Sequence, residues 1–245
     1  MTSVRQILTE YGVANSALSK RECESLDREG YVVLPYLIDA AWLERLKTAF
    51  DSEYEKGGRS RAYESGTRHV DDLVNRGAVF EGIYTHPRAL AAVHHVLRDE
   101  FRVAQVGGRD PLPGYGQQGL HADWTARARG EPFRIVAAIC LLDNFTADNG
   151  ATRVVPGTHH MLNPPPKSFA NPSSRHPQQE VIVAHAGSIL VFNGHLWHSG
   201  TANRSNRSRR VVQCCFVGRD ELRFSRIKVN APDSLSPAAR YLLAV

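Results

Sequence analysis

The chain has 245 residues, of which 42% are hydrophobic and 22% charged, so it has the composition of a globular protein rather than of a disordered or collagen-like one. Thirty lysine and arginine residues against 25 acidic residues give a formal net charge of +5, an excess that is diffuse apart from one arginine-rich stretch and does not predict a nucleic-acid-binding protein. No apolar run reaches the 18 residues of a membrane-spanning helix.

The chain shows no break in composition and no internal repeat, so we expect a single domain over residues 1–245. Its first residues lack the basic-then-apolar order of a secretory signal, which favours a cytoplasmic protein. The four cysteines form no Cys-x-x-Cys pair, so neither a disulfide framework nor a zinc site is expected. The oligomeric state is left open.

Residues 1–100 are predicted to be rich in helix. Asp39 is a favourable cap for a helix whose apolar residues recur with helical spacing at Leu43, Leu46 and Phe50. Pro87 is a favourable first residue for a second helix, whose apolar positions are Leu90, Val93, Leu97 and Phe101. We expect both helices to pack against the rest of the chain.

From about residue 101 to 220 the pattern changes to short β-like runs separated by Gly, Pro and Asn clusters, which is typical of a sandwich or barrel. The predicted strands are 101–106, 133–142, 152–155, 181–184, 188–192 and 209–217. Two connections, residues 107–119 and 163–179, are rich in turn-forming residues and are candidate lids over a site.

Two His-x-Asp pairs occur in the chain, namely His69 with Asp71 and His121 with Asp123. In a strand such a spacing places both side chains on one face, where they can reach one metal ion. About one such pair is expected by chance, so the spacing alone is weak evidence. Only the second pair lies in the β-rich half, and we therefore interpret the first as a local pair or part of a pocket wall.

A third metal ligand and a cation follow further along the chain. His198 is predicted as the ligand in preference to His195, because it precedes a Ser-Gly-Thr-Ala-Asn run and lies eleven residues before Arg209. Two histidines and one carboxylate leave open positions on Fe(II) for a chelating cosubstrate and dioxygen. An arginine nearby could bind a dicarboxylate through two parallel charge-assisted bonds.

The chain resembles the phytanoyl-CoA dioxygenase family of Fe(II)/2-oxoglutarate enzymes. The resemblance rests on His121-Ala-Asp123, the Asn149-to-His159 segment and His198-x10-Arg209, with Gly30-Tyr-Val-Val-Leu-Pro35 matching the amino-terminal portion. It implies a mainly β fold with supporting helices, a double-stranded β-helix or cupin-like jelly roll. It implies Fe(II), 2-oxoglutarate and dioxygen as cofactor and cosubstrates, with ascorbate as a stimulant.

Carried over by this resemblance, His121, Asp123 and His198 are the iron ligands and Arg209 binds 2-oxoglutarate. Gln105 and Arg109 fall near positions that meet the cosubstrate in the family. A departure from the family pattern occurs at Ala137, where some members place a hydroxyl residue beside the arginine.

The predicted activity is oxidation, most simply hydroxylation, of a small-molecule metabolite or natural-product intermediate, with conversion of 2-oxoglutarate to succinate. Candidate substrate-lining residues are Trp124, Trp197 and Tyr115. Two alternatives remain at this point. One is a jelly-roll binding protein without catalysis, and the other is a cupin-like metal enzyme that does not use 2-oxoglutarate.

Overall fold

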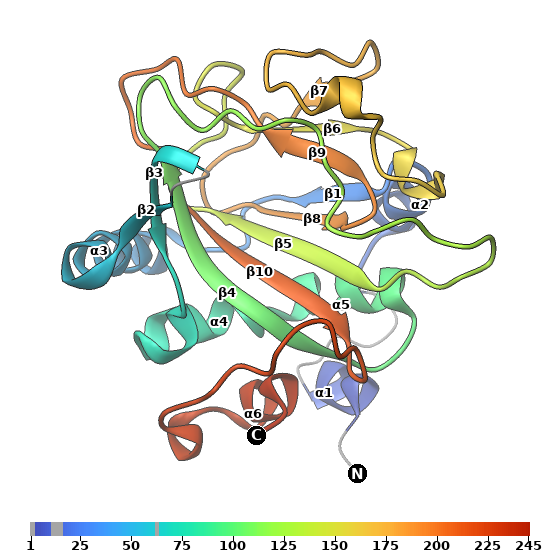
Figure 1. The fold of residues 1–245 in the computed structure, drawn as a ribbon. Helices are drawn as coiled ribbons and strands as arrows, with labels where there is room; N and C mark the ends of the chain where they lie inside the picture. The colour runs from blue at the N-terminus through green and yellow to red at the C-terminus, as the bar shows by residue number, and fades with distance from the viewer. Residues whose placement is uncertain (1–2, 11–16, 62–63) are drawn as a thin grey trace.

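The computed structural model describes residues 3–10, 17–61 and 64–245 of the chain. Its strands form two antiparallel sheets, with the smaller sheet above the larger one in Figure 1. The larger sheet has the order β1-β8-β5-β10-β4-β3-β2 and the smaller one the order β7-β6-β9. The strands are β1 Tyr31–Leu34, β2 Arg59–Arg61, β3 Glu64–Val70, β4 Phe101–Pro111, β5 Ile135–Leu141, β6 Thr152–Val155, β7 Glu180–Val181, β8 Ile189–Asn193, β9 Trp197–Gly200 and β10 Val211–Gly218.

Helices pack on the outer face of the larger sheet, on the side away from the smaller sheet (Figure 1). They are α1 Val4–Glu10, α2 Lys20–Arg28, α3 Ala40–Gly57, α4 Glu81–Tyr84, α5 Pro87–Leu97 and α6 Pro237–Leu243, with short 3-10 turns η1 Leu73–Asn75, η2 Ala78–Phe80, η3 Thr158–His160, η4 Lys167–Phe169 and η5 Pro232–Ser234. Among the described residues, no helix has both the length and the apolar character needed to span a membrane. The mainly β architecture with supporting helices is the predicted one.

The two predicted helices are present and begin where the sequence places them. The Asp39 side chain accepts a hydrogen bond of 2.8 Å from the main-chain N–H of Trp42, which satisfies one of the free donors at the start of α3. Pro87 is the first residue of α5. Phe101, however, belongs to β4, because Arg98 adopts a left-handed conformation that ends α5.

The predicted β run at 152–155 coincides with β6, and the other five runs overlap β4, β5, β7, β8 and β10 with shifted ends. One expectation is wrong: residues 107–111 are not part of a loop but continue β4, where Gly107 and Gly108 pair with Gln213 and Val212 of β10. A glycine is required at position 108, since a Cβ there would lie 2.4 Å from the Phe50 ring. Strands β1, β2, β3 and β9 were not predicted.

Both faces of the larger sheet are buried, which explains why every residue of β5 is inaccessible. Along β5, Val136, Ala138 and Cys140 pack toward the helices, whereas Ala137, Ile139 and Leu141 face the smaller sheet. The helix side forms the larger hydrophobic cluster. The space between the two sheets is therefore where the strands can present side chains to a ligand.

Candidate active site

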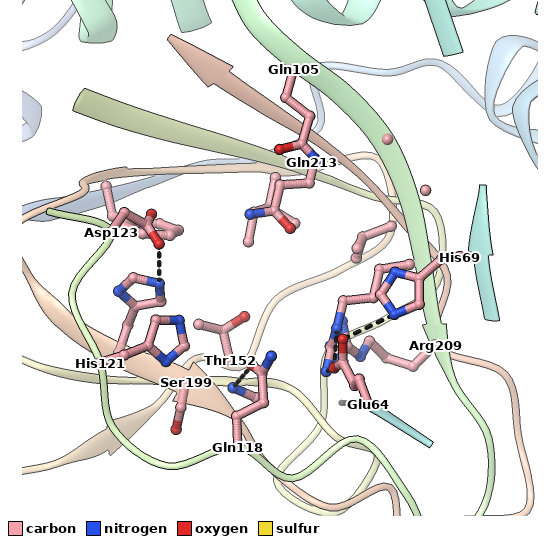
Figure 2. Close-up of a pocket in the computed structure, with 18 of the residues that line it drawn as sticks. Glu64, His69, Gln105, Gln118, His121, Asp123, Thr152, Ser199, Arg209 and Gln213 are labelled. Atoms are coloured by element: carbon pink, nitrogen blue, oxygen red, sulfur yellow. Dashed lines mark hydrogen bonds and ion pairs between the residues drawn. The ribbon is translucent and has the colours of Figure 1, made fainter. Parts of the chain in front are cut away.

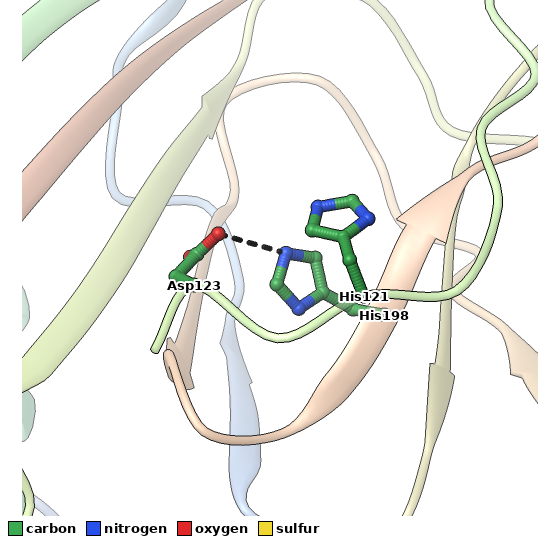
Figure 3. Close-up of side chains that lie close together, drawn as sticks. All are labelled: His121, Asp123 and His198. Atoms are coloured by element: carbon green, nitrogen blue, oxygen red, sulfur yellow. Dashed lines mark ion pairs between the residues drawn. The ribbon is translucent and has the colours of Figure 1, made fainter. Parts of the chain in front are cut away.

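The three predicted metal ligands converge between the two sheets (Figure 3). His198 lies on β9, and His121 pairs with it through an isolated antiparallel bridge, with reciprocal main-chain hydrogen bonds of 3.0 and 2.9 Å. Asp123 is fixed two residues later by a 2.7 Å hydrogen bond from its N–H to the carbonyl of Gly194. One potential ligand atom from each of the three side chains lies within 4.8 Å of the others.

Main-chain carbonyls orient both imidazole rings. Nδ1 of His121 lies 3.0 Å from the carbonyl oxygen of Gly119, and Nδ1 of His198 lies 2.8 Å from that of Leu196. An Nδ1–H donated to a carbonyl leaves Nε2 as the basic nitrogen, which is the usual arrangement of a metal-binding histidine. Nε2 of His198 lies 3.5 Å from Oδ1 of Asp123.

The electrostatics of the three side chains suit a cation. Burial, followed by the charge of His198, lowers the pKa of His121 to about 4, so that this ring is neutral near pH 7 and needs no deprotonation to bind a metal. Burial disfavours the charged forms of Asp123 and His198, but the attraction between the two charges outweighs the effect of burial. It lowers the pKa of Asp123 and raises that of His198.

The triad lines one end of a cavity of about 200 Å³ between the sheets, and Arg209 lies at the other end (Figure 2). The Arg209 side chain is 1% exposed, and its Nε and Nη2 have no hydrogen-bond partner among the described residues. Burial, followed by the charge of Arg109, lowers the pKa of this guanidinium well below its ordinary value. A buried cation with unused donors is costly, and an anion in the cavity would remove that cost.

The main chain holds Arg209 in place. Its N–H donates a 2.8 Å hydrogen bond to Oδ1 of Asp110, a fully buried carboxylate on β4 that also accepts from the guanidinium of Arg68. The Arg209 guanidinium packs against the Phe145 ring, with Cζ 5.0 Å from the ring centroid. These contacts leave the donor edge of the guanidinium to the cavity.

A second charged group, Glu64 with His69 and Arg109, forms the wall beside Arg209. Arg109 donates to Oε1 of Glu64 through Nε at 2.7 Å and also through Nη2, and Oε2 lies 2.9 Å from Nε2 of His69. Burial opposes ionisation of Glu64, but the hydrogen bond to His69 and the charge of Arg109 outweigh it and lower its pKa to about 2. The charge of Arg109 is thus balanced within the protein.

Gln105 and Arg109, predicted to meet the cosubstrate, both line the cavity but lie at separate positions of β4. The expectation about Ala137 is wrong. The register of the sheet pairs Ala137 with Cys215, six residues along the chain from Arg209, so residue 137 does not lie beside the arginine. The hydroxyl groups that line the cavity come instead from Thr152 on β6 and Ser199 on β9.

The three aromatic residues predicted to contact substrate do not line this cavity. Trp124 packs with Ile135 and Val217 under the guanidinium of Arg223, and Trp197 packs with Leu120 and Val155. Tyr115 is 46% exposed on the loop after β4. Their large apolar surfaces are used in packing or lie outside the cavity.

The choice between the two candidate histidines after β8 is resolved by the strand geometry. His195 lies in the turn before β9, where its ring packs 5.5 Å from that of Phe133 and its Nε2 accepts a hydrogen bond from the N–H of Arg134. His198, three residues later, is on β9 and faces His121. Of these two histidines, only His198 joins Asp123 and His121.

The sequence did not identify several residues of the cavity wall, namely Glu64, Gln118, Thr152, Ser199 and Gln213. His69 and Asp71, interpreted as a pocket wall or local pair, do line the same cavity. Regular alternation along β3 would place Glu64 on the face opposite His69. The pairing of β3 with β2 is irregular, so no local pattern predicts that the two side chains meet at the cavity.

Two histidines, one carboxylate and open space around them form the donor set of non-haem iron sites that bind further ligands. The family model of phytanoyl-CoA dioxygenase (PhyH) matches residues 26–211. The chain therefore belongs to the phytanoyl-CoA dioxygenase family. The resemblance inferred from the motifs is confirmed, and the protein is an iron- and 2-oxoglutarate-dependent dioxygenase.

Curated relatives and solved structures agree with this class. The dioxygenase trt7 of Aspergillus terreus is 28% identical over 224 residues, which is 81% of this chain and 74% of that protein. The dioxygenase cdmA of Talaromyces verruculosus is 27% identical, over 78% of this chain and 70% of that protein.

Two solved structures share the fold at low identity. HygX from Streptomyces hygroscopicus, crystallised with nickel, 2-oxoglutarate and hygromycin B, has a TM-score of 0.73 at 16% identity and covers 88% of this chain and 94% of its own. The epimerase SnoN from nogalamycin biosynthesis has a TM-score of 0.65 at 18% identity, over 81% of this chain and 82% of its own. The predicted jelly roll is thereby confirmed.

Proposed function

We propose that His121, Asp123 and His198 hold Fe(II), that Arg209 binds the distal carboxylate of 2-oxoglutarate, and that the enzyme hydroxylates a small molecule. The observation that carries this proposal is the buried guanidinium of Arg209, whose Nε and Nη2 have no hydrogen-bond partner among the described residues, at one end of a cavity whose other end is the triad. A dicarboxylate chelated to the metal would supply that guanidinium with the acceptors that it lacks.

The protein's own groups prepare this arrangement before the cosubstrate arrives. The carbonyls of Gly119 and Leu196 fix the rings of His121 and His198, so that both present Nε2 to the same point. When bound, the ferrous ion supplies the dioxygen chemistry that couples decarboxylation of the cosubstrate to oxidation of the substrate. The buried floor of Ile139, Phe192 and Val211 excludes water from the cosubstrate.

Arg109 serves the site indirectly in this proposal. Nε and Nη2 of its guanidinium bind Glu64, and Nη2 also donates a 3.0 Å hydrogen bond to the carbonyl of Gly116. The charge of Arg109 is balanced by Glu64, so Arg109 supports the cavity wall beside Arg209 without contacting the cosubstrate. This role differs from direct contact with the cosubstrate, which the family resemblance suggested.

The test is anaerobic titration of the protein with Fe(II) and 2-oxoglutarate, recorded as the weak visible charge-transfer band of the chelate. Wild-type protein is expected to give the band, and Arg209→Met to need at least about ten-fold more 2-oxoglutarate, since it loses a charge-assisted pair. The matched control is Arg207→Met, an exposed arginine of the same loop, which should titrate as wild type. No band with wild-type protein would reject the proposal.

Mass spectrometry of a metabolite mixture after aerobic turnover identifies the reaction. Hydroxylation adds one oxygen to the substrate. An unchanged mass would instead match epimerisation, since SnoN is described as an epimerase. A loss of two hydrogens would match ring closure, since SnoK is described as a carbocyclase. Either of these outcomes would overturn hydroxylation while leaving the iron site intact.

A further inference from the structure

We propose, building on the proposed function, that Gln105 and Gln213 form the substrate-recognition site and that the substrate is a hydroxylated small molecule without an anionic group. Figure 2 shows the two carboxamides on one side of the cavity, apart from the Arg209 end and facing the space beside Asp123 and His121. With a metal bound at the triad and the cosubstrate at Arg209, this side of the cavity would stay open to a substrate.

The sheet register places the two glutamines on one face. Gln213 of β10 pairs with Gly107 of β4, and Cys215 pairs with Gln105, so the two glutamines are diagonal neighbours across adjacent strands. Gln105 and Arg109 are four positions apart, which corresponds to roughly 13 Å along an extended strand. Gln105 is therefore too far from the Arg209 end to share the distal carboxylate of the cosubstrate.

The donors and acceptors of both carboxamides are available to a ligand. Neither side chain makes a hydrogen bond to a residue in the part of the chain that the structure describes. Gln105 is exposed at the mouth of the cavity, and Gln213 is partly buried deeper in it. Each carboxamide offers two donors and an acceptor, which suits the hydroxyl groups of a ligand. An apolar ligand would bury these groups without partners, at a cost that hydroxyl groups avoid.

Charge decides against an anionic substrate. The cavity wall contains three carboxylates and two guanidinium groups, from Glu64, Asp71, Asp123, Arg109 and Arg209. The two charges of a ferrous ion and those of 2-oxoglutarate cancel, so the loaded cavity gains no positive charge that would attract an anion. Nε and Nη2 of Arg109 are bound to Glu64 and Gly116, and the free donors of Arg209 are assigned to the cosubstrate. Among the described residues of the cavity wall, both guanidinium groups are therefore already engaged, which disfavours a phosphate or carboxylate of the substrate.

Three compound sets test the proposal, with succinate release by the Fe(II)-loaded enzyme as the readout. The sets are neutral glycosides and cyclitols, then terpene hydrocarbons without a hydroxyl group, then sugar phosphates and acyl-coenzyme A thioesters. We expect the first set to raise succinate release over the rate without substrate. In Gln105→Leu and Gln213→Leu we expect kcat/KM for the active compound to fall about ten-fold each, whereas Gln178→Leu, an exposed glutamine outside the cavity, should match wild type.

A response to the terpene hydrocarbons or the anionic compounds that equals or exceeds the response to the glycosides would overturn the substrate class. Unchanged kcat/KM in both leucine variants would overturn the assignment of the glutamines. Circular dichroism of each variant separates misfolding from loss of recognition, and each single variant tests the pair separately. The anaerobic band of wild-type protein is recorded alongside: its absence rejects the iron and cosubstrate sites, whereas its presence with an equal response rejects only this inference.

Discussion

At the scale of single residues, Asp123 and His198 share one charge interaction, with 3.5 Å between the carboxylate oxygen and Nε2. Asp71 lines the same cavity but is not a member of the triad. This difference gives a matched pair of carboxylates for testing which of the two His-x-Asp motifs binds iron.

We predict that Asp123→Ala weakens Fe(II) binding by more than about 100-fold, beyond the ten- to hundred-fold effect typical of partners that only orient a ligand. Asp71→Ala is expected to leave the Fe(II) dissociation constant unchanged. Anaerobic equilibrium dialysis measures both. Loss of iron by the Asp71 variant would mean that the first motif is the metal site.

Glu64 connects the cavity wall to pH. Because His69 and Arg109 lower its pKa from 4.5 to about 2, its carboxylate stabilises the folded state at every pH above about 4.5. That contribution decreases as the pH falls from 4.5 toward 2, on the order of 2–3 kcal/mol in total. We expect Glu64→Gln to lose stability at pH 7 and to show a flatter loss between pH 4.5 and pH 3. Urea unfolding at these pH values provides the measurement, and parallel curves for the two proteins would contradict it.

At the scale of elements, the segment before His121 is held closely against the loop that contains η4. The N–H of Leu120 donates to the carbonyl of Phe169 at 2.9 Å, and a Cβ on Gly119 would lie 2.1 Å from the carbonyl oxygen of Ala170. Both groups are main chain, so neither can rotate away as a side chain would.

We therefore predict that Gly119→Ala displaces the His121 segment, lowers Tm by several degrees and weakens Fe(II) binding. Gly57→Ala is the control, because a Cβ at the end of α3 meets only the Arg76 side chain at 3.9 Å. Differential scanning calorimetry measures Tm of the two variants, and iron titration measures their affinity for Fe(II). Equal iron affinity for the two variants would show that the loop adapts.

Some elements of the fold could be predicted from the sequence and others could not. The helix at Asp39 and the strand 152–155 could be predicted, because a helix cap and a short β-like run are local signals. The convergence of His121, Asp123 and His198 was expected from the resemblance of their motifs to a known family. Strand β3 could not be predicted, since its sequence Glu-Ser-Gly-Thr-Arg-His-Val has no apolar alternation. Its polar residues are buried against the cavity by pairing with β4, about 40 residues away along the chain, a contact that no local pattern reports.

At the scale of the whole molecule, the larger sheet separates two hydrophobic clusters. Leu242 of α6 belongs to the cluster on the helix side, whereas Phe192 of β8 belongs to the cluster between the sheets and lines the cavity. The Phe192 ring lies 4.5 Å from that of His198. Damage to the two sides should therefore affect the site differently.

Leu242→Ala is expected to lower the free energy of unfolding by about 2–4 kcal/mol and Phe192→Ala by about 3–5 kcal/mol. Only the second should also weaken Fe(II) binding, because it frees the His198 ring. Urea unfolding and iron titration of both variants separate the two effects. Equal weakening of iron binding would show that the helix layer and the site are coupled through the sheet.

The antiparallel bridge between His121 and His198 joins the 112–134 connection to β9 by two main-chain hydrogen bonds, and a third runs from the N–H of Gln118 to the carbonyl of Gly200. An ion held by both rings would add a cross-link at the same point, and this cross-link would form and dissolve with the supply of iron. Binding of the ion would therefore restrain the long connection as well as complete the metal site.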